Sequence, residues 1–438
     1  ALHQAGISVI LDVAFNHTAE GGEDGPIINF KGVMNRGFYH LEDHDPMLYK
    51  NYSGCGNTVN CNHPLVARFI IESLEYWVRE FHVDGFRFDL ASILARGEDG
   101  APMYHAPVVW NIEFSNTLAH TRLIAEAWDA GGLYQVGGFP GFRWAEWNGR
   151  YRDLVRQFVK GDPGKVAKLA TRLTGSSDLY QSSGRLPINS VNFITCHDGF
   201  TLYDLVSYNE KHNQANGEGN RDGDNQNHSR NYGAEGVTDD PAVNKLRKQQ
   251  VKNFMAVLLL SQGVPMILAG DELLRTQQGN NNCYCQDNEL SWFDWNLLEE
   301  NQEMFCFTKG MIKLRKRHPC LMQRQFMSGA KNDISKLPDV SWHGKQLNKP
   351  QWREQSSQVL ACTLSRVDPD EEDLHLMFNM SDESLNMELP KLKERTWHMA
   401  VDTARSISSG VIEPEQQKKI TEESIQVSSH SVVVCESR

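Results

Sequence analysis

The sequence predicts an α/β fold, and three patterns support this. Short apolar runs rich in Val and Ile alternate with segments of helical periodicity up to about residue 320, as in parallel βα units. Polar residues gather where these runs end, which in a (β/α)8 TIM barrel is the rim that carries the active site. Short alternating strands follow. We therefore expect a catalytic barrel at 1–322 and a small antiparallel β-sandwich domain at 323–438.

Six apolar runs are the predicted barrel strands, because strands buried on both faces of a sheet are nearly continuous in apolar residues. Five runs are clear, and the fourth is weaker. In chain order they are 6–16, 83–91, 122–129, 144–149, 190–199 and 264–272.

Helices are predicted between these strands. Pro64 suits the first position of a helix, and apolar residues then recur at helical spacing up to Phe81. Further helices are expected at 150–160, 243–261 and 303–318. The basic run 313–318 (KLRKRH) is expected to be the solvated face of a helix end.

The last part of the chain predicts loops and short strands. Residues 323–357 are polar and are expected to be loop. Strands are expected at 358–364, 373–379, 385–389, 395–402, 424–427 and 430–436.

Earlier in the chain, the Asn-, Gly- and Asp-rich segment 213–233 is either disordered or a functional loop. Its position after a strand with acidic residues at its end favours the functional loop.

The charge balance excludes some partners. Lys and Arg number 44 and Asp and Glu 56, so the net charge is −12, which repels phosphate backbones and anionic membranes. We expect neither nucleic acid nor a membrane as partner. No apolar run reaches the roughly 18 residues of a membrane span. The nine cysteines are mostly far apart and lack zinc-site spacing, which favours a reduced intracellular compartment.

Two carboxylates at predicted strand ends are candidates for chemistry. Arg87 and Asp89 are two positions apart and therefore share one face of a strand. A cation beside a carboxylate keeps it ionised, so Asp89 is a candidate nucleophile; a purely structural ion pair is the alternative. Glu126 follows a strand of apolar residues and precedes Trp128. An apolar, aromatic wall favours a protonated carboxyl, hence a general acid; a core Glu paired with a distant basic residue is the alternative.

Polar and aromatic residues near the same strand ends suit a carbohydrate. The pairs Asn16–His17 and His197–Asp198 follow two other strands and can bond sugar hydroxyls. One ionised and one protonated carboxylate across a cleft are the apparatus of glycoside hydrolysis. Five aromatic residues could stack on sugars, although core packing is expected for each singly: Trp128, Tyr134, Phe139, Trp144 and Trp147.

Four motifs in order carry a family resemblance. DVAFNH (12–17), GFRFDLA (85–91), IAEAWD (124–129) and ITCHDG (194–199) resemble the signature regions of the α-amylase superfamily. Longer stretches, such as SGCGNTVNCNHP (53–64), are similar to its isoamylase and glycogen-debranching group. The resemblance implies retaining hydrolysis of α-1,6 branch linkages in glycogen, amylopectin or limit dextrins. Pullulanase, α-1,4-hydrolase or branching-transferase activity and a non-catalytic glucan-binding subunit are the alternatives.

The resemblance also implies roles for residues. Asp89 would be the nucleophile, Glu126 the acid and then the base, and Asp198 a third carboxylate on the reacting sugar. Arg87 would orient Asp89. Trp128 could stack on a sugar, and the residues expected to line the cleaved sugar's subsite are Asp12, Asn16, His17 and His197.

The resemblance has further implications. No cofactor is required; calcium is possible, but no cluster has convincing ligand spacing. In the family the DVAFNH strand is the third, so strands three to eight are expected here. The chain is then expected to be an N-terminally incomplete fragment that is not a competent enzyme alone. A bacterial cytoplasm is the expected compartment, with the plastid stroma as alternative.

Overall fold

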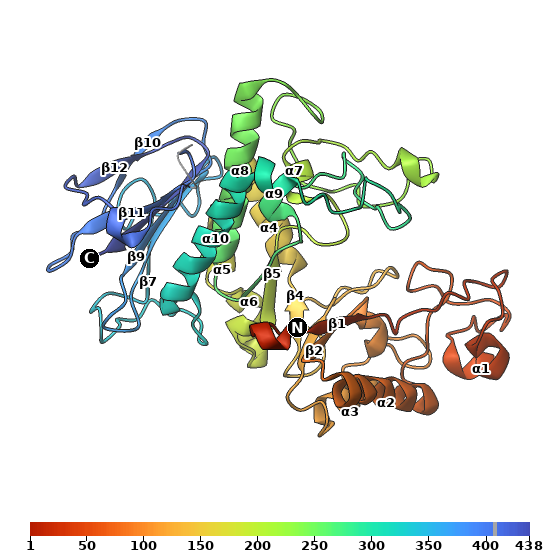
Figure 1. The fold of residues 1–438 in the computed structure, drawn as a ribbon. Coiled ribbons are helices and arrows are strands. Elements are labelled where there is room, and N and C mark those ends of the chain that lie inside the picture. The colour runs from red at the N-terminus through yellow and green to blue at the C-terminus, as the bar shows by residue number, and fades with distance from the viewer. Residues whose placement is uncertain (406–409) are drawn as a thin grey trace. The chain divides into compact units, whose positions relative to one another are not determined.

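The six predicted barrel strands form one sheet in the computed structural model, which describes residues 1–405 and 410–438. They follow one another in chain order: β1 Ile10–Val13, β2 Gly85–Phe88, β3 Arg122–Ala125, β4 Ala145–Trp147, β5 Ser190–Phe193 and β6 Val264–Met266. The neighbours β1 and β2 are seen side by side in Figure 1. The pairs from β1 to β5 are parallel. Each strand is shorter than the run that predicted it, and the polar residues at the carboxyl end of each run lie outside the strand.

The chain divides into two compact units. The first unit comprises Ala1–Asn148 and Asp178–Val191, and the second unit Gly149–Ser177 and Asn192–Arg438. The first unit holds β1 to β4 and the beginning of β5. The second unit holds β6 and all of the antiparallel strands.

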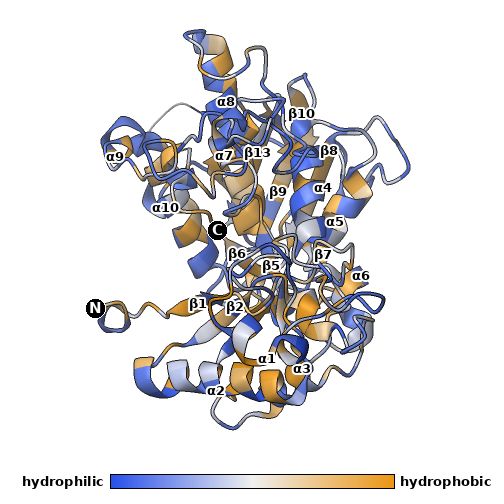
Figure 2. Ribbon diagram, turned by 90° about the vertical axis from the view of Figure 1, so that its right-hand side faces the viewer, coloured by the Kyte–Doolittle hydropathy of each residue, from blue (hydrophilic) through white to orange (hydrophobic). Residues whose placement is uncertain are grey.

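The helices confirm the predicted periodicities. In the first unit, α2 covers Pro64–Phe81 as predicted; its apolar positions Val66, Ile70 and Leu74 are buried, and its polar positions alternate with them in Figure 2. Pro64 opens this helix because its missing N–H has no partner to lose there. The other helices are α1 Phe30–Phe38, α3 Pro107–Phe114, α4 Gly149–Lys160, α5 Val166–Leu173, α6 Ser177–Tyr180, α7 Leu202–Leu205, α8 Pro241–Leu260, α9 Leu297–Glu300 and α10 Gln302–Arg317.

The antiparallel strands enclose a second core. A five-stranded sheet has the order β11-β13-β9-β8-β7, and β10 pairs with β12 (Figure 1). Their bounds are β7 Val340–His343, β8 Val359–Leu364, β9 Leu374–Asn379, β10 Leu385–Glu388, β11 Trp397–Asp402, β12 Ser424–Val427 and β13 Ser431–Ser437. In β8, Leu360 and Cys362 join the core that contains α8 and α10, whereas Val359 and Ala361 join the core of the antiparallel sheets. Successive residues point to opposite faces, so both faces of β8 are apolar.

One strand was missed. Residues 323–357 were expected to be loop, but β7 lies within them and pairs antiparallel with β8, Val340 opposite Leu364 and Trp342 opposite Cys362. Four residues in a polar segment are too few for a periodicity signal. The ladder hydrogen bonds to β8 supply what the local sequence does not.

The interpretation of 313–318 as a solvated face was wrong for half of its residues. Lys313 and Lys316 are exposed, but Arg315 and His318 are buried. The Arg315 guanidinium donates to the carbonyls of Leu259 and Ser261 (both 2.7 Å) and of Gly263 (2.8 Å). These carbonyls lie at the carboxyl end of α8, where unsatisfied acceptors and the helix dipole favour a cation.

Two further observations concern the described residues. Among residues 1–405 and 410–438, none of the helices combines the length and the apolar content that a membrane span requires. All nine cysteines belong to this described part, and each is a free thiol.

Candidate active site

One arginine in the first unit contacts three carboxylates. The β1–β2 register places Asp12 opposite Arg87, and Nη1 of Arg87 donates to both oxygens of Asp12 (2.8 and 3.0 Å) and to Oδ1 of Asp89 (2.9 Å). Its Nη2 lies 2.8 Å from Oε2 of Glu126. Burial opposes the charge of Arg87, but Glu126, Asp12 and Asp89 outweigh burial and raise its pKa. One cation, the guanidinium of Arg87, therefore contacts both catalytic candidates, Asp89 and Glu126.

Asp89 lies directly after β2 and is held at both oxygens. Nδ2 of Asn16 donates to Oδ2 of Asp89 (2.7 Å) and to its backbone carbonyl (2.8 Å), while Arg87 donates to Oδ1. The expected pairing of Arg87 with Asp89 is therefore present. The Asp89 side chain is still 24% exposed. An oriented carboxylate that remains accessible is suited to attack a bound substrate.

Glu126 lies directly after β3 and is almost fully buried, with 6% of its side chain exposed. The backbone N–H of Leu90 donates to Oε2 at 2.8 Å, the oxygen that also contacts Arg87. The alternative expectation, a core Glu paired with an Arg or Lys elsewhere in the chain, matches this contact with Arg87. Only the register between β2 and β3, which places Arg87 opposite Ile124, brings the two side chains together.

The aromatic residues divide into core and accessible groups. Trp144 packs against Phe139 with ring centroids 5.1 Å apart, and both are buried, as expected for core. The Trp147 ring lies 4.1 Å from the guanidinium carbon of Arg87, a cation–π contact that fixes the arginine further. Trp128 and Tyr134 stack at 5.9 Å with nearly parallel rings, and Tyr134 is 46% exposed. This pair offers a flat apolar surface of the kind that stacks on sugar rings.

The other site candidates lie in two places. In the first unit, His17 bonds Oδ1 of Asn16 through Nδ1, and Asn16 is buried. His197 and Asp198 belong to the second unit, where Nε2 of His197 lies 3.5 Å from Oδ2 of Asp198 and both side chains are at least half exposed. The structure thus joins Asp12, Asn16, His17, Arg87, Asp89 and Glu126 by direct contacts, and joins His197 to Asp198.

The segment 213–233 is ordered through polar contacts within the second unit, so disorder was the wrong alternative. Nδ2 of Asn213 donates to Oδ1 of Asn281 (2.8 Å), and Nδ2 of Asn216 donates to Asp222 (2.7 Å). The carbonyl of Asn281 in turn accepts from the N–H of Gly199, next to Asp198 (2.9 Å). The Asn-rich segment therefore forms a loop that hydrogen bonds connect, through Asn281, to Gly199 of the fourth motif.

Asp271 is a strand-end carboxylate that serves structure. It follows β6, is fully buried, and accepts hydrogen bonds from the N–H of Leu202 (2.9 Å) and the hydroxyl of Thr195. Burial raises the pKa of Asp271 to about 7. Position at a strand end alone therefore does not identify a catalytic carboxylate.

Replacing Asp271 by Asn is expected to change how stability depends on pH. With a folded-state pKa of about 7 against an ordinary value of 3.8 for an aspartate, the folded state keeps a proton that the unfolded state releases. The native contribution of Asp271 to stability therefore falls as pH rises from about 4 to 7, by at most about 1.4 kcal/mol per pH unit. Asn does not titrate, so the stability of the variant relative to native should improve between pH 5 and pH 7 in urea unfolding. The same change at exposed Asp294 is the control; parallel pH profiles for native and Asp271→Asn would contradict the assignment.

Metal-ligating side chains cluster elsewhere in the sequence. Among residues 1–405 and 410–438, the one group of three or more such side chains within reach of a single ion is His318, Cys320 and Glu371. None of them belongs to the four motifs.

The fold is similar to that of pullulanases of known structure. Type I pullulanase from Bacillus subtilis str. 168, complexed with maltose, matches with a TM-score of 0.74 over 99% of this chain and 54% of that chain, at 22% identity. This identity is low, so the match defines the fold. The four motifs at the strand ends, together with relatives in sequence, define the class: a chain of the α-amylase superfamily.

Relatives in sequence narrow the class to a family. The glycogen operon protein GlgX homolog of Mycobacterium tuberculosis (strain ATCC 25618 / H37Rv) is 51% identical over 357 residues, covering 80% of this chain and 49% of that protein. Isoamylase SU1, chloroplastic, of Zea mays is 46% identical over 424 residues, covering 92% and 52%. A family model described as isoamylase 1-3, C-terminal, matches residues 341–434. The chain belongs to the isoamylase-type family, and it spans about half the length of the curated relatives it matches.

Proposed function

We propose that this chain carries the catalytic part of an isoamylase-type debranching enzyme, which hydrolyses α-1,6 branch linkages of glycogen, amylopectin or limit dextrins. The observation that carries the proposal is the single guanidinium of Arg87, which contacts both Asp89 and Glu126. The proposal includes a (β/α)8 barrel whose strands three to eight are β1 to β6, at 1–322, and a separate β domain at 323–438. The proposed compartment is a bacterial cytoplasm, with the plastid stroma as alternative, in keeping with GlgX and chloroplastic relatives.

The first step forms a covalent intermediate. A lone pair on a carboxylate oxygen of Asp89 attacks the anomeric carbon of the branch sugar while Glu126 donates a proton to the departing O6 of the main chain. The C1–O6 bond breaks, and an ester joins C1 to Asp89. The bonds from Arg87 and Asn16 hold the Asp89 carboxylate in line for this attack. Asp198 is the third carboxylate, which binds the reacting sugar and stabilises positive charge on it.

The second step releases the sugar. Glu126, now ionised, removes a proton from water, which attacks C1 and displaces the Asp89 carboxylate. Two inversions return the α configuration. Retention requires a separation of about 5 Å between the two carboxyl groups, and two carboxylates on one guanidinium favour that separation over the wider spacing of inverting enzymes. Neither step requires a cofactor.

The remaining candidates are proposed to hold the substrate. Asn16 and His17 already form one hydrogen-bonded pair beside Asp89, and with Asp12 and His197 they would bond the hydroxyls of the cleaved sugar. The stacked pair of Trp128 and Tyr134 would support a sugar ring through its exposed aromatic surface. A branched α-glucan is therefore the proposed partner.

The linkage that is cleaved tests this proposal. The protein carrying this sequence is incubated separately with glycogen or amylopectin, with pullulan and with linear amylose, and the products are sized and assayed for reducing ends. We expect linear chains from glycogen and amylopectin, slow pullulan cleavage and intact amylose. Rapid pullulan cleavage would support the pullulanase alternative, shortened amylose an α-1,4-hydrolase, and newly formed branches a transferase. Binding without any cleavage would support a glucan-binding subunit.

A further inference from the structure

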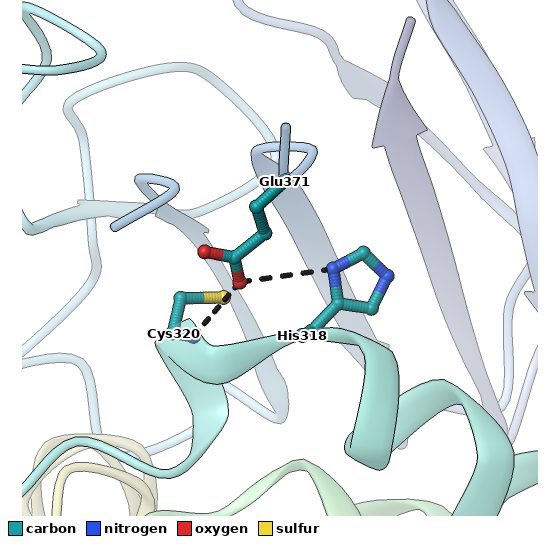
Figure 3. Close-up of side chains that lie close together, drawn as sticks. All are labelled: His318, Cys320 and Glu371. Atoms are coloured by element: carbon teal, nitrogen blue, oxygen red, sulfur yellow. Dashed lines mark hydrogen bonds and ion pairs between the residues drawn. The ribbon is translucent and has the colours of Figure 1, made fainter. Parts of the chain in front are cut away.

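Three different metal-ligating side chains meet in the interior of the second unit (Figure 3). His318 follows α10, Cys320 lies in the 3-10 helix η7 (Pro319–Leu321), and Glu371 lies in the loop between β8 and β9. One ligand atom from each lies within 4.8 Å of the other two, and all three residues are buried. A nitrogen, a sulfur and an oxygen donor are thereby brought from separate elements to one point.

The orientation of His318 matches that of a metal ligand. Its Nε2 lies 3.1 Å from Oε1 of Glu436. Its Nδ1 is fully buried, has no hydrogen-bond partner, and is directed towards Oε1 of Glu371 at 3.9 Å (Figure 3). A metal-bound histidine characteristically bonds a carboxylate through one ring nitrogen and binds the ion through the other.

Backbone hydrogen bonds hold both oxygens of the Glu371 carboxylate in place. Oε1 of Glu371 accepts from the N–H of Cys320 (2.8 Å), and Oε2 accepts from the N–H of Val367 (2.8 Å). Burial, and then the neighbouring Glu371, raises the pKa of the Cys320 thiol well above its usual value. Oε2 of Glu372 also lies 3.9 Å from Nδ1 of His318, and its side chain reaches solvent. A fourth possible ligand, a carboxylate oxygen of Glu372, is thus adjacent.

Ion pairs alone explain the surroundings of Nε2 of His318 but not those of Nδ1. Arg317 and Arg438 both contact Glu436, so the carboxylate at Nε2 already has cationic partners. On the Nδ1 side, 3.9 Å is too long for a hydrogen bond. In a tetrahedral zinc centre with bonds of about 2.0–2.3 Å, the ligand atoms are about 3.3–3.8 Å apart. The cluster therefore needs only small side-chain rotations to close on an ion.

We infer that Nδ1 of His318, Sγ of Cys320 and a carboxylate oxygen of Glu371 bind a Zn²⁺ ion, with Glu372 or a water as fourth ligand. Mixed nitrogen, sulfur and oxygen donors suit zinc rather than calcium or magnesium. Binding forms the Zn–S bond and releases the thiol proton of Cys320 to solvent. One thiolate and one carboxylate then neutralise the ion, as a buried site requires.

The site would connect parts of the second unit that are distant in sequence. His318 and Cys320 directly follow α10, whereas Glu371 lies in the loop that joins β8 to β9 of the five-stranded sheet. An ion bound to the folded state alone raises its stability by mass action. The inference is independent of the proposed glucan chemistry, because none of the four motifs contributes a ligand.

Metal loading of the native protein is the primary test. Protein is stripped with a chelator and titrated with Zn²⁺, or with Co²⁺ as a spectroscopic probe. We expect one equivalent per chain, a thiolate-to-cobalt charge-transfer band, and an increase in Tm of about 5 °C with saturating Zn²⁺. A native protein that binds neither ion, with a Tm unchanged by Zn²⁺ and chelator, would overturn the inference.

Matched variants identify the ligands. Cys320→Ser and His318→Gln should each weaken Zn²⁺ binding by at least about 100-fold, and Glu436→Gln by about 10- to 100-fold. Cys362→Ser makes the same chemical change at another buried cysteine, and Cys306→Ser removes an exposed thiol; both should bind like native. If the cobalt band is lost in Cys306→Ser, or survives unchanged in Cys320→Ser, the ion binds elsewhere and the inference is wrong.

Discussion

Asp89→Asn is expected to lower the rate of glycogen debranching by on the order of 10⁴-fold or more, because covalent catalysis cannot begin without the carboxylate. Asn keeps the size of the side chain and can still accept a hydrogen bond from Arg87. Glucan binding and thermal stability should therefore change little. The rate is measured by release of reducing ends from amylopectin, and binding by affinity electrophoresis.

The matched control for Asp89 is Asp84→Asn, the same change just before β2. Asp84 accepts a hydrogen bond from the N–H of Val9 and contacts Nε2 of His3, and neither residue is a site candidate. The debranching rate of Asp84→Asn should therefore stay within a few-fold of native. Retention of more than a few per cent of activity by Asp89→Asn would refute the nucleophile assignment.

Glu126→Gln is expected to separate two kinds of substrate. Glucan departure needs a proton, so loss of the acid should slow debranching by about 10²- to 10⁴-fold. Fluoride departs without protonation, so the first step on an α-maltotriosyl fluoride should remain within about tenfold of native. The measurement is the burst of released fluoride, because the later hydrolysis also needs Glu126 as base.

The comparison with Glu113→Gln controls for removal of a buried glutamate. Glu113 accepts from the N–H of Arg143 (3.0 Å) and lies in the first unit, outside the four motifs. The Glu113→Gln variant should therefore change the rates on the glucan and on the glycosyl fluoride to the same extent. If Glu126→Gln loses both substrates to the same extent, Glu126 is not the acid.

The sequence predicted most elements because their signals are local. The boundaries of α2 follow from Pro64 and an apolar periodicity, and the six strands of the parallel sheet follow from apolar runs. β7 was missed because its four residues gain strand geometry from β8. Arg315 was read as solvated because its acceptors, the carbonyls of Leu259, Ser261 and Gly263, are over fifty positions away.

The sequence predicts the residues of the proposed site, but it does not predict most of the contacts between them. Two-residue spacing predicts that Arg87 and Asp89 share a face, and the structure contains that pair. The contacts of Arg87 with Asp12 and Glu126 depend on register between strands, which no single strand encodes. The cluster of His318, Cys320 and Glu371 was not predicted either, because its members come from separate elements that only the fold brings together.

Mass spectrometry of a trapped intermediate shows whether Asp89 becomes covalently attached to the sugar. The protein is treated with a 5-fluoro maltosyl fluoride, which forms the intermediate faster than water releases it, and is then digested and sequenced. The assignment of Asp89 as nucleophile predicts one sugar per active chain, on the peptide that contains residues 85–91 and at Asp89. A label on another carboxylate, or full turnover of the reagent with no covalent adduct at any time, would contradict it.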